Sequence, residues 1–373
     1  MKLGALLCVV VLVTTCHEAL AAAPPPVTAR AYVVENAATG EVLAARDART
    51  PVPIASLTKL MTVLVVLEHH RLGDVVVVDR RAGAIGESTI GLRGGERMTV
   101  RDLVKAALIQ SANDAADALA LSVSQDFSSF ARLMNEKARA LGLTDTHFVR
   151  PDGLDAPGHV SSARDVTTLA RAAMRIRFVR ETVRERSDTI AGGRTLHTWN
   201  DLLATFPHLL GVKTGHTAAA GWSQVAAARG RGITIYATIL GGPTRSQRND
   251  DLTELLAWGI AQYRVVHAVD PRRIYATVAL PYGKDPVELR AAKPLLAVVR
   301  VERPLTEKVV AAGAVQLPVH AGDVLGHVEV RAGKRLIGRR DLVASRTVNR
   351  PGTVARVGWY AGRTIHHLAG FFS

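Results

Sequence analysis

The chain has 373 residues, of which 48% are hydrophobic and 21% are charged. This balance is typical of a folded globular protein and excludes an intrinsically disordered chain. The length allows two or three domains. The formal net charge is +14, so any partner of the surface is expected to be anionic.

The first residues have the pattern of a secretory signal peptide. Met1-Lys2 precedes an apolar run from Leu3 to Val13, and Ala19-Leu20-Ala21 offers small residues for cleavage. We therefore expect residues 1–23 to be removed and the protein to be exported to a periplasmic or other extracytoplasmic compartment. A retained membrane anchor is the alternative, but the apolar run is shorter than a membrane-spanning helix requires.

Both cysteines, Cys8 and Cys16, lie inside this segment, so the mature chain has no thiol for a disulfide, a nucleophile or a metal site. The residues before Cys16 match a lipid-attachment site poorly. For an exported basic protein, the expected partners are anionic wall polymers or phospholipid head groups. We expect no nucleic-acid partner, because no clustered aromatic and basic pattern is present. A basic surface that is merely well solvated explains the same charge.

The first half of the mature chain is predicted to mix helices and strands. Two short strands, 30–34 and 41–45, are expected to form a hairpin. A turn then enters an apolar helix that has Ser56 and Lys59 in its first turn. Thr99 has the sequence context of a helix cap. Further helices are expected at 103–110, 114–122 and 127–141, and after Ser162.

A group of strands is expected next. The runs 221–228 and 232–240 are predicted as antiparallel strands, with Lys213-Thr214-Gly215 at the beginning of an edge strand. Arg248 is placed on the loop after these strands, before a helix over 250–263. From Asp270 onward short β-rich runs predict a small all-β domain. The runs are 274–280, 295–301, 309–317, 324–330 and 336–342.

The tail after Pro351-Gly352 carries apolar and aromatic residues together with arginine and histidine. This composition is typical of an amphipathic helix that lies on a membrane surface. A helix packed on its own domain, or a frayed end, is an equal alternative. The expected domains are therefore 27–268, 269–350 and a tail of 351–373, after the signal peptide.

Ser56 and Lys59 have the spacing of a catalytic pair. Residues three apart on a helix share a face, so the hydroxyl and the amine can meet. The helix N-terminus adds unpaired N–H groups that can stabilise an oxyanion. Lys59 can act as the base if burial and a cationic neighbour lower its pKa. Alone, the pair is better explained by a capping serine followed by a surface lysine.

Two later motifs change this assessment. Ser111-Ala112-Asn113 lies on a short connection between two apolar helices, and Lys213-Thr214-Gly215 lies at the predicted edge strand. Alone, the first is also explained as an ordinary turn between helices. The ordered set S-x-x-K, S-x-N and K-T-G is found in penicillin-binding proteins and class A β-lactamases. Here Ala112 replaces the usual aspartate.

With these motifs the chain resembles the low-molecular-weight penicillin-binding proteins of the serine D-alanyl-D-alanine carboxypeptidase family, similar to peptidase family S11. The resemblance in motifs covers roughly residues 30–265. The β-rich domain and the tail resemble the family's layout in their general sequence character and not by motif. It implies an α+β fold: a β-lactamase/transpeptidase-like domain with an antiparallel sheet sandwiched by helices, then a small all-β domain and a C-terminal amphipathic helix. The segments that carry it are Ala55–Lys59, Gln110–Asp114, Gly153–Asp155, Ser161–Asp165 and Gly211–Thr217.

The resemblance also implies roles for individual residues. Ser56 would be the acylated nucleophile and Lys59 its base, while Ser111 and Asn113 would relay a proton and hold the substrate backbone. Lys213 would keep Lys59 neutral. The substrate would be bound by Lys213, Thr214, Gly215, His216 and Arg248, with the N–H groups of Ser56 and His216 as the oxyanion hole. A surface arginine is the alternative for Arg248.

The implied reaction removes the terminal D-alanine from a peptidoglycan stem pentapeptide, and β-lactams would acylate the same serine. No metal or cofactor is implied. A Ser-His-Asp hydrolase is disfavoured because Gly221-Trp222-Ser223-Gln224-Val225 fails the G-x-S-x-G pattern at its last position. A metal hydrolase is disfavoured because the chain has no H-E-x-x-H. A β-lactamase, or a penicillin-binding sensor or scaffold without turnover, remains as an alternative.

Overall fold

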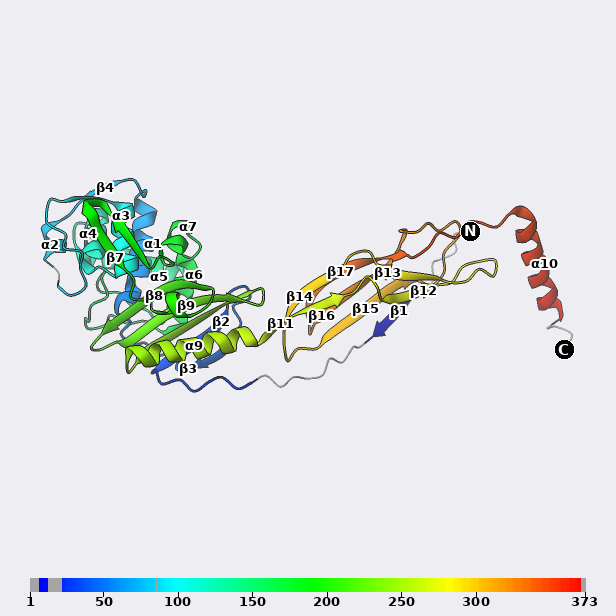
Figure 1. Ribbon diagram of the computed structural model, residues 1–373, viewed down its shortest axis with the longest axis horizontal. Helices are drawn as coiled ribbons and strands as arrows, with labels where there is room; N and C mark the ends of the chain where they lie inside the picture. The colour runs from blue at the N-terminus through cyan, green and yellow to red at the C-terminus, as the bar shows by residue number, and fades with distance from the viewer. Residues whose placement is uncertain (1–6, 13–21, 85, 370–373) are drawn as a thin grey trace. The chain divides into compact units, whose positions relative to one another are not determined.

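The computed structural model describes residues 7–12, 22–84 and 86–369 (Figure 1). The described chain divides into two compact units. Residues 22–261 form one unit, and residues 262–369 form the other together with strand β1.

The first unit is built on a five-stranded antiparallel sheet. Strand β8, which carries the Lys213-Thr214-Gly215 motif, lies at one edge of this sheet, as predicted. The predicted hairpin is also confirmed, since β2 and β3 pair in antiparallel register. Across the sheet, the strands are β3 (Val42–Arg46), β2 (Ala31–Asn36), β10 (Ile233–Gly242), β9 (Gly221–Gly230) and β8 (Leu209–Thr217).

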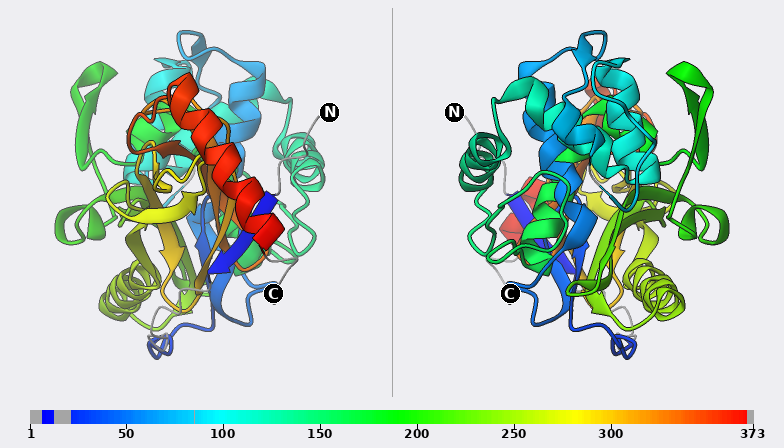
Figure 2. Two further views of the ribbon diagram at one scale, coloured as in Figure 1. Left: turned by 90° about the vertical axis from the view of Figure 1, so that its right-hand side faces the viewer. Right: turned by 90° about the vertical axis from the view of Figure 1, so that its left-hand side faces the viewer.

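Helices cover both faces of the sheet. Ile235 and Thr238 on β10 are three residues apart, so they point to opposite faces. A Cβ atom at Gly259 of α9 (Arg245–Ala261) would lie 2.9 Å from Ile235, whereas Thr167 of α6 (Ala163–Ala173) hydrogen-bonds to Thr238 at 2.6 Å. The predicted sandwich is confirmed. Both views of Figure 2 place α9, in yellow-green, across the sheet from the blue and cyan helices.

Helix α1 (Lys59–His69) lies at the centre of the helical layer. Its residues from Lys59 to Val66 are all buried, and it contacts α4, α5 and α6. Because these residues are buried all round the helix, α1 is fixed in position by packing rather than by one amphipathic stripe. It therefore gives the residues at its N-terminus a rigid support.

The predicted helix starts are confirmed at their caps. Thr99 accepts a hydrogen bond from the Asp102 N–H at 3.1 Å, and Ser162 accepts one from the Asp165 N–H at 3.2 Å. The further helices are α2 (Arg80–Gly83), α3 (Val100–Lys105), α4 (Asn113–Val123), α5 (Phe127–Ala140), α7 (Arg177–Thr182) and α8 (Leu202–Thr205). Two small antiparallel sheets pair β4 (Val75–Val77) with β5 (Arg97–Thr99) and β6 (Ser187–Ile190) with β7 (Arg194–His197).

The second unit is the predicted all-β domain, followed by the helical tail α10 (Thr353–Ala369). Each of the predicted runs overlaps a strand, although β15 begins and ends earlier than the predicted run 309–317. Strands β11 and β13 were not predicted. The strands are β11 (Tyr263–Val269), β12 (Ile274–Val278), β13 (Val287–Ala291), β14 (Leu295–Arg300), β15 (Leu305–Ala312), β16 (Val324–Ala332) and β17 (Arg335–Ala344).

The expected signal peptide falls largely outside the described residues. Its described part forms β1 (Leu7–Leu12), which pairs with β15 in antiparallel register. Removal of residues 1–23 stays a prediction, and it would leave β15 at the edge of its sheet. Within the described ranges, we find no helix of sufficient length and apolar character to cross a membrane.

Candidate active site

Ser56 and Lys59 meet at the buried beginning of α1. Ser56 lies in a 3₁₀ turn (Ala55–Thr58) that leads directly into α1. The Lys59 amine donates hydrogen bonds to Ser56 Oγ at 2.7 Å, to Asn113 Oδ1 at 2.7 Å and to the Asp152 carbonyl at 2.6 Å. The predicted pair is therefore joined by a direct hydrogen bond. A surface lysine is excluded, because Lys59 is fully buried.

A second amine–hydroxyl pair joins the other two motifs. The Lys213 amine, also buried, donates to Ser111 Oγ and to the Thr214 carbonyl, each at 2.8 Å. Ser111 has a φ of 64°, in the left-handed region that residues other than glycine rarely adopt. This conformation ends the π-helical turn Ala106–Gln110 and precedes α4. Strained backbone of this kind is common where a side chain must be held in one direction.

Glycine at position 215 lets the edge strand approach the nucleophile. A Cβ atom there would lie 2.9 Å from the Ile54 carbonyl oxygen and 3.1 Å from the Ser56 nitrogen. Any larger residue would push β8 away from the turn that holds Ser56. Beyond Gly215, the His216 ring stacks on Trp222 with centroids 4.0 Å apart.

The loop around Gly153 supports the nucleophile turn from the other side. Gly153 has a φ of 85°, and a Cβ atom there would lie 2.2 Å from the Ala55 carbonyl oxygen. The preceding residue, Asp152, supplies the carbonyl that accepts from Lys59, and its carboxylate pairs with Arg150 at 2.5 and 2.6 Å. Asp152 and Arg150 were not predicted, because carbonyl ligation leaves no signature in the sequence.

His159 supports the same turn through Thr58 and was also not predicted. Its Nδ1 accepts from the Val149 N–H at 3.0 Å, so its Nε2 carries the proton and donates to Thr58 Oγ1 at 2.8 Å. Burial lowers the pKa of His159 to about 4. The ring is therefore neutral at neutral pH and acts as a structural support.

Arg248 lies in the first turn of α9 and not on a loop, which corrects the prediction for this residue. The helix begins at Arg245, five residues earlier than predicted from the apolar pattern alone, because its first turn is polar. Arg248 is buried, forms an ion pair with Asp201 at 3.3 Å and lies 5.6 Å from the Trp222 ring centroid. Burial lowers its pKa to about 10, so it stays charged at neutral pH.

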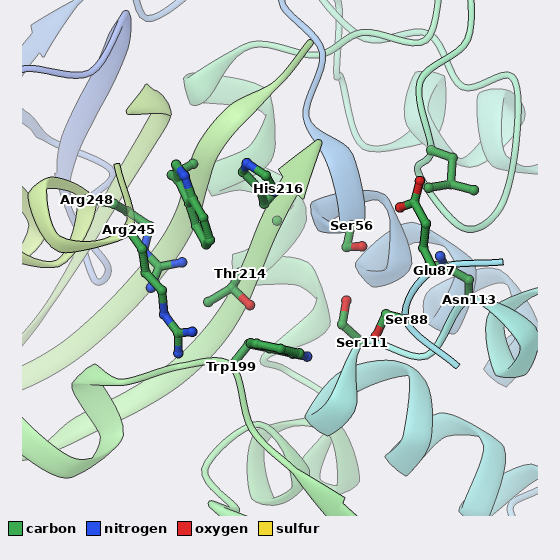
Figure 3. Close-up of a pocket in the computed structure, with 13 residues that line it drawn as sticks. Ser56, Glu87, Ser88, Ser111, Asn113, Trp199, Thr214, His216, Arg245 and Arg248 are labelled. Atoms are coloured by element: carbon green, nitrogen blue, oxygen red, sulfur yellow. The ribbon is translucent and has the colours of Figure 1, made fainter. Parts of the chain in front are cut away.

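These groups converge on one cleft, with an empty volume of about 730 Å³ (Figure 3). The predicted residues in its wall are Ser56, Ser111, Asn113, Thr214, Gly215, His216 and Arg248. Leu154 also lines it and belongs to the segment Gly153–Asp155, for which no role was predicted. The residues that the sequence did not indicate are Glu87, Ser88, Trp199, Trp222 and Arg245.

Burial makes both amines easier to deprotonate. It lowers the pKa of Lys59 to about 8, against the opposing effect of nearby carboxylates, first Asp152 and then Asp117. Burial also lowers the pKa of Lys213 well below its ordinary value, and the charges of Lys59 and Arg248 add to this. The arrangement can therefore provide a neutral amine hydrogen-bonded to a serine hydroxyl near neutral pH.

Asp117 is a buried acid one helical turn after Asn113 on α4. It is 1% exposed, and in the described part of the chain its Oδ1 has no hydrogen-bond partner. Burial, and then the Asp152 charge, raise the pKa of Asp117 to about 8. At neutral pH this side chain is therefore mostly protonated.

A family model described as D-alanyl-D-alanine carboxypeptidase, peptidase family S11, matches residues 18–244, which is more than half of the chain. The chain belongs to this family. A second model, described as the C-terminal domain of penicillin-binding protein 5, matches residues 271–350. The resemblance drawn from the three motifs is confirmed.

Relatives extend over nearly the whole chain. The D-alanyl-D-alanine carboxypeptidase DacC of Escherichia coli K12 is 32% identical over 369 residues, covering 93% of this chain and 90% of its own. The structure of penicillin-binding protein 6B from Escherichia coli has a TM-score of 0.66 and 28% identity, covering 88% and 99% of the two chains. Penicillin-binding protein D2 from Listeria monocytogenes, in its ampicillin-bound form, has a TM-score of 0.57 and 32% identity, covering 62% and 98%.

We predict that Asp117→Asn changes how stability depends on pH. Between pH 4 and pH 8 the unfolded carboxyl has released its proton while the folded one retains it, so each pH unit costs the folded state up to about 1.4 kcal/mol. Asparagine does not titrate, so the folded variant does not lose this stability as the pH rises. The free energy of unfolding of the variant, relative to the unchanged protein, should therefore rise between pH 5 and pH 8.

Urea unfolding followed by tryptophan fluorescence measures this difference, since Trp199, Trp222 and Trp258 lie in the first unit. Asp250→Asn, at an exposed site on α9, is the matched control and should show no such trend. An identical pH dependence in the Asp117 variant and the unchanged protein would contradict a protonated Asp117.

Proposed function

We propose that this protein is a serine D-alanyl-D-alanine carboxypeptidase that uses Ser56 to remove the terminal D-alanine from peptidoglycan stem pentapeptides. One observation carries the proposal: the buried Lys59 amine is hydrogen-bonded at 2.7 Å to Oγ of Ser56, which lines a cleft together with Ser111 and Asn113. A nucleophile hydrogen-bonded to a base of depressed pKa is the arrangement that acyl transfer requires.

Acylation begins when neutral Lys59 takes the proton of the Ser56 hydroxyl. Oγ then bonds to the carbonyl carbon between the two D-alanines, and the negative charge moves to the carbonyl oxygen. We assign stabilisation of this oxygen to the backbone N–H groups of Ser56 and His216, which the close approach at Gly215 brings near one another. Preorganised donors of this kind contribute about 3–4 kcal/mol each to transition-state stabilisation.

The leaving D-alanine needs a proton on its nitrogen when the C–N bond breaks. Ser111 is placed to deliver it, because its hydroxyl already accepts a hydrogen bond from the Lys213 amine and can pass on its own proton while receiving another. Asn113 holds Lys59 through Oδ1. Water then attacks the Ser56 ester and passes a proton through Ser111 to Lys213. The peptide acid leaves, and Ser56 Oγ takes back the proton held by Lys59.

The terminal carboxylate of the substrate is proposed to bind between Lys213, Thr214 and Arg248. The Lys213 amine loses solvation by burial, so an arriving carboxylate favours its protonated form. A proton held at Lys213 in turn repels one at Lys59, which favours the neutral base. Substrate binding and base activation are coupled in this way. β-Lactams present a comparable carboxylate and a reactive carbonyl, and we propose that they acylate Ser56.

We predict that Ser56→Ala abolishes release of D-alanine from a synthetic pentapeptide ending in D-Ala-D-Ala, lowering the rate by roughly a thousandfold or more. It should also abolish labelling by a fluorescent penicillin. Ser128→Ala, at an exposed serine on α5, is the control and should retain both activities.

Three results would redirect the proposal. Stoichiometric labelling of the Ser56 variant would exclude Ser56 as the nucleophile. If the unchanged protein binds penicillin but releases no D-alanine, a sensor or scaffold is favoured. Rapid hydrolysis of penicillin without peptide turnover would instead favour a β-lactamase.

The rate of acylation should rise with pH. With the pKa of Lys59 at about 8, roughly a tenth of this amine is neutral at pH 7. Stopped-flow acylation by penicillin should therefore increase about tenfold from pH 6 to pH 7 and level off above pH 8. Lys59→Arg, permanently charged, should show almost no acylation at any pH. A flat profile from pH 6 to pH 9 would argue against Lys59 as the base.

We further propose that the protein acts outside the cytoplasm, with α10 lying on an anionic membrane surface. Val354 and Val357, three residues apart on this helix, are 88% and 64% exposed, and the tail adds arginine and histidine. The same helix also contacts its own domain, because Trp359 and Tyr360 lie 5.3 and 6.0 Å from the Tyr282 ring. These aromatic contacts and a membrane-facing apolar stripe are compatible, since they involve different residues.

Deletion of residues 353–373 from the mature protein should abolish cosedimentation with vesicles of anionic phospholipid, while D-alanine release from a soluble peptide is retained. Val354→Asp with Val357→Asp should weaken vesicle binding severalfold, because it removes apolar area and adds repulsion. Equal binding of the truncated and the complete protein would refute a membrane role for the tail.

A further inference from the structure

The two ends of the cleft carry opposite charges. Arg245 and Arg248 lie at one end, where the terminal carboxylate of the substrate is proposed to bind. Glu87 lies at the other end, with Ser56 between them (Figure 3). A peptide whose only charge is its terminal carboxylate would use only the cationic end. The acidic end therefore indicates that the substrate also carries a positive charge.

The segment that carries Glu87 is held rigidly against the Ser111-Ala112-Asn113 turn. The Asn113 N–H donates to the Ser88 carbonyl at 2.6 Å, Ser88 Oγ donates to the Gln110 carbonyl at 3.0 Å, and the Gln110 amide donates to the Thr89 carbonyl at 3.0 Å. The Asp114 carboxylate then accepts from the N–H groups of Ile90 and Leu92 at 3.0–3.2 Å. Glu87 therefore directly precedes a segment that is anchored to the turn that holds Ser111 and Asn113.

The Glu87 side chain is available for a ligand. Its φ is 63°, a left-handed conformation that is unfavourable for glutamate and that sets the direction of its Cα–Cβ bond. In the described part of the chain its carboxylate has no hydrogen-bond or ion-pair partner. Its charge acts on Arg150, but that guanidinium is engaged by Asp152. The acid therefore faces the cleft without a protein cation bound to it.

The direction of the substrate follows from the proposed function, on which this inference rests. With the terminal carboxylate near Arg248 and the scissile carbonyl at Ser56, the preceding residues extend toward Glu87. We propose that Glu87 binds the side-chain ammonium of the residue that immediately precedes D-Ala-D-Ala, and so selects stem peptides in which this diamino-acid side chain is free. Leu154, which also lines the cleft, offers an apolar contact for the side-chain methylenes.

A role for Glu87 as a base for deacylation is less consistent with the geometry. Lys59 already occupies the hydrogen-bonding position at Ser56 Oγ, and Glu87 is exposed at the rim. An exposed carboxylate is suited to an ammonium partner, and such a pair typically contributes a few-fold in affinity.

The test compares two peptides, Nα-acetyl-Lys-D-Ala-D-Ala with a free side-chain amine and the same peptide acetylated on that amine. The complete protein should show a kcat/KM for D-alanine release that is about three- to fivefold higher for the free amine, and 0.5 M salt should reduce this preference. Glu87→Gln should bring the ratio to about one, and Glu87→Lys should bring it below one. Glu254→Gln, an exposed site on α9, should keep the original ratio.

Two results would overturn the inference: equal kcat/KM values for the two peptides with the unchanged protein, or an equal loss for both in Glu87→Gln, which would assign Glu87 to the chemical steps. Failure of the unchanged protein to release D-alanine from either peptide would instead overturn the proposed function, and this inference with it.

Discussion

The interaction on which this site depends is the burial of one amine among three oxygen acceptors. Lys59 donates to Ser56 on its own turn and to Asn113 and Asp152, which are 54 and 93 positions away in the chain. A buried ammonium is costly unless its hydrogen bonds are satisfied. The three acceptors reduce this cost, but burial still lowers the pKa of Lys59 to about 8. The packing that buries Lys59 therefore also lowers its pKa, so that it can act as the base.

The site also depends on the close approach of two backbone segments to the turn that holds Ser56. Gly153 and Gly215 lie on opposite sides of the nucleophile turn, and a Cβ atom at either position would collide with its backbone. The turn is therefore fixed from both sides by main chain, with the neutral His159 ring beneath Thr58. Such rigidity lets hydrogen-bond donors be placed before the substrate arrives, which is the main source of electrostatic catalysis.

The residues around the cleft also place opposite charges at its two ends. The arginine end is held by Asp201, which pairs with Arg245 and Arg248, and the acidic end is held by the hydrogen bonds of the segment around Ser88. The catalytic hydroxyls lie between the two ends. A peptide with a carboxylate at its terminus and an ammonium farther back would meet a complementary charge at each end, and this complementarity fixes its direction.

The sequence by itself determined the family, the α+β fold and the core of the site, because S-x-x-K, S-x-N and K-T-G are local patterns. It also predicted the helix starts at Thr99 and Ser162 and the edge position of β8. Tertiary structure alone decided which residues surround these motifs. Asp152, His159 and Asp201 act through contacts with segments far away in the chain. Asp117 and Glu87 matter because folding buries the first and brings the second to the cleft. Arg248 was misplaced because the first turn of α9 is polar. A single acid or histidine has no local signature, since its partner, its burial and hence its pKa exist only after folding.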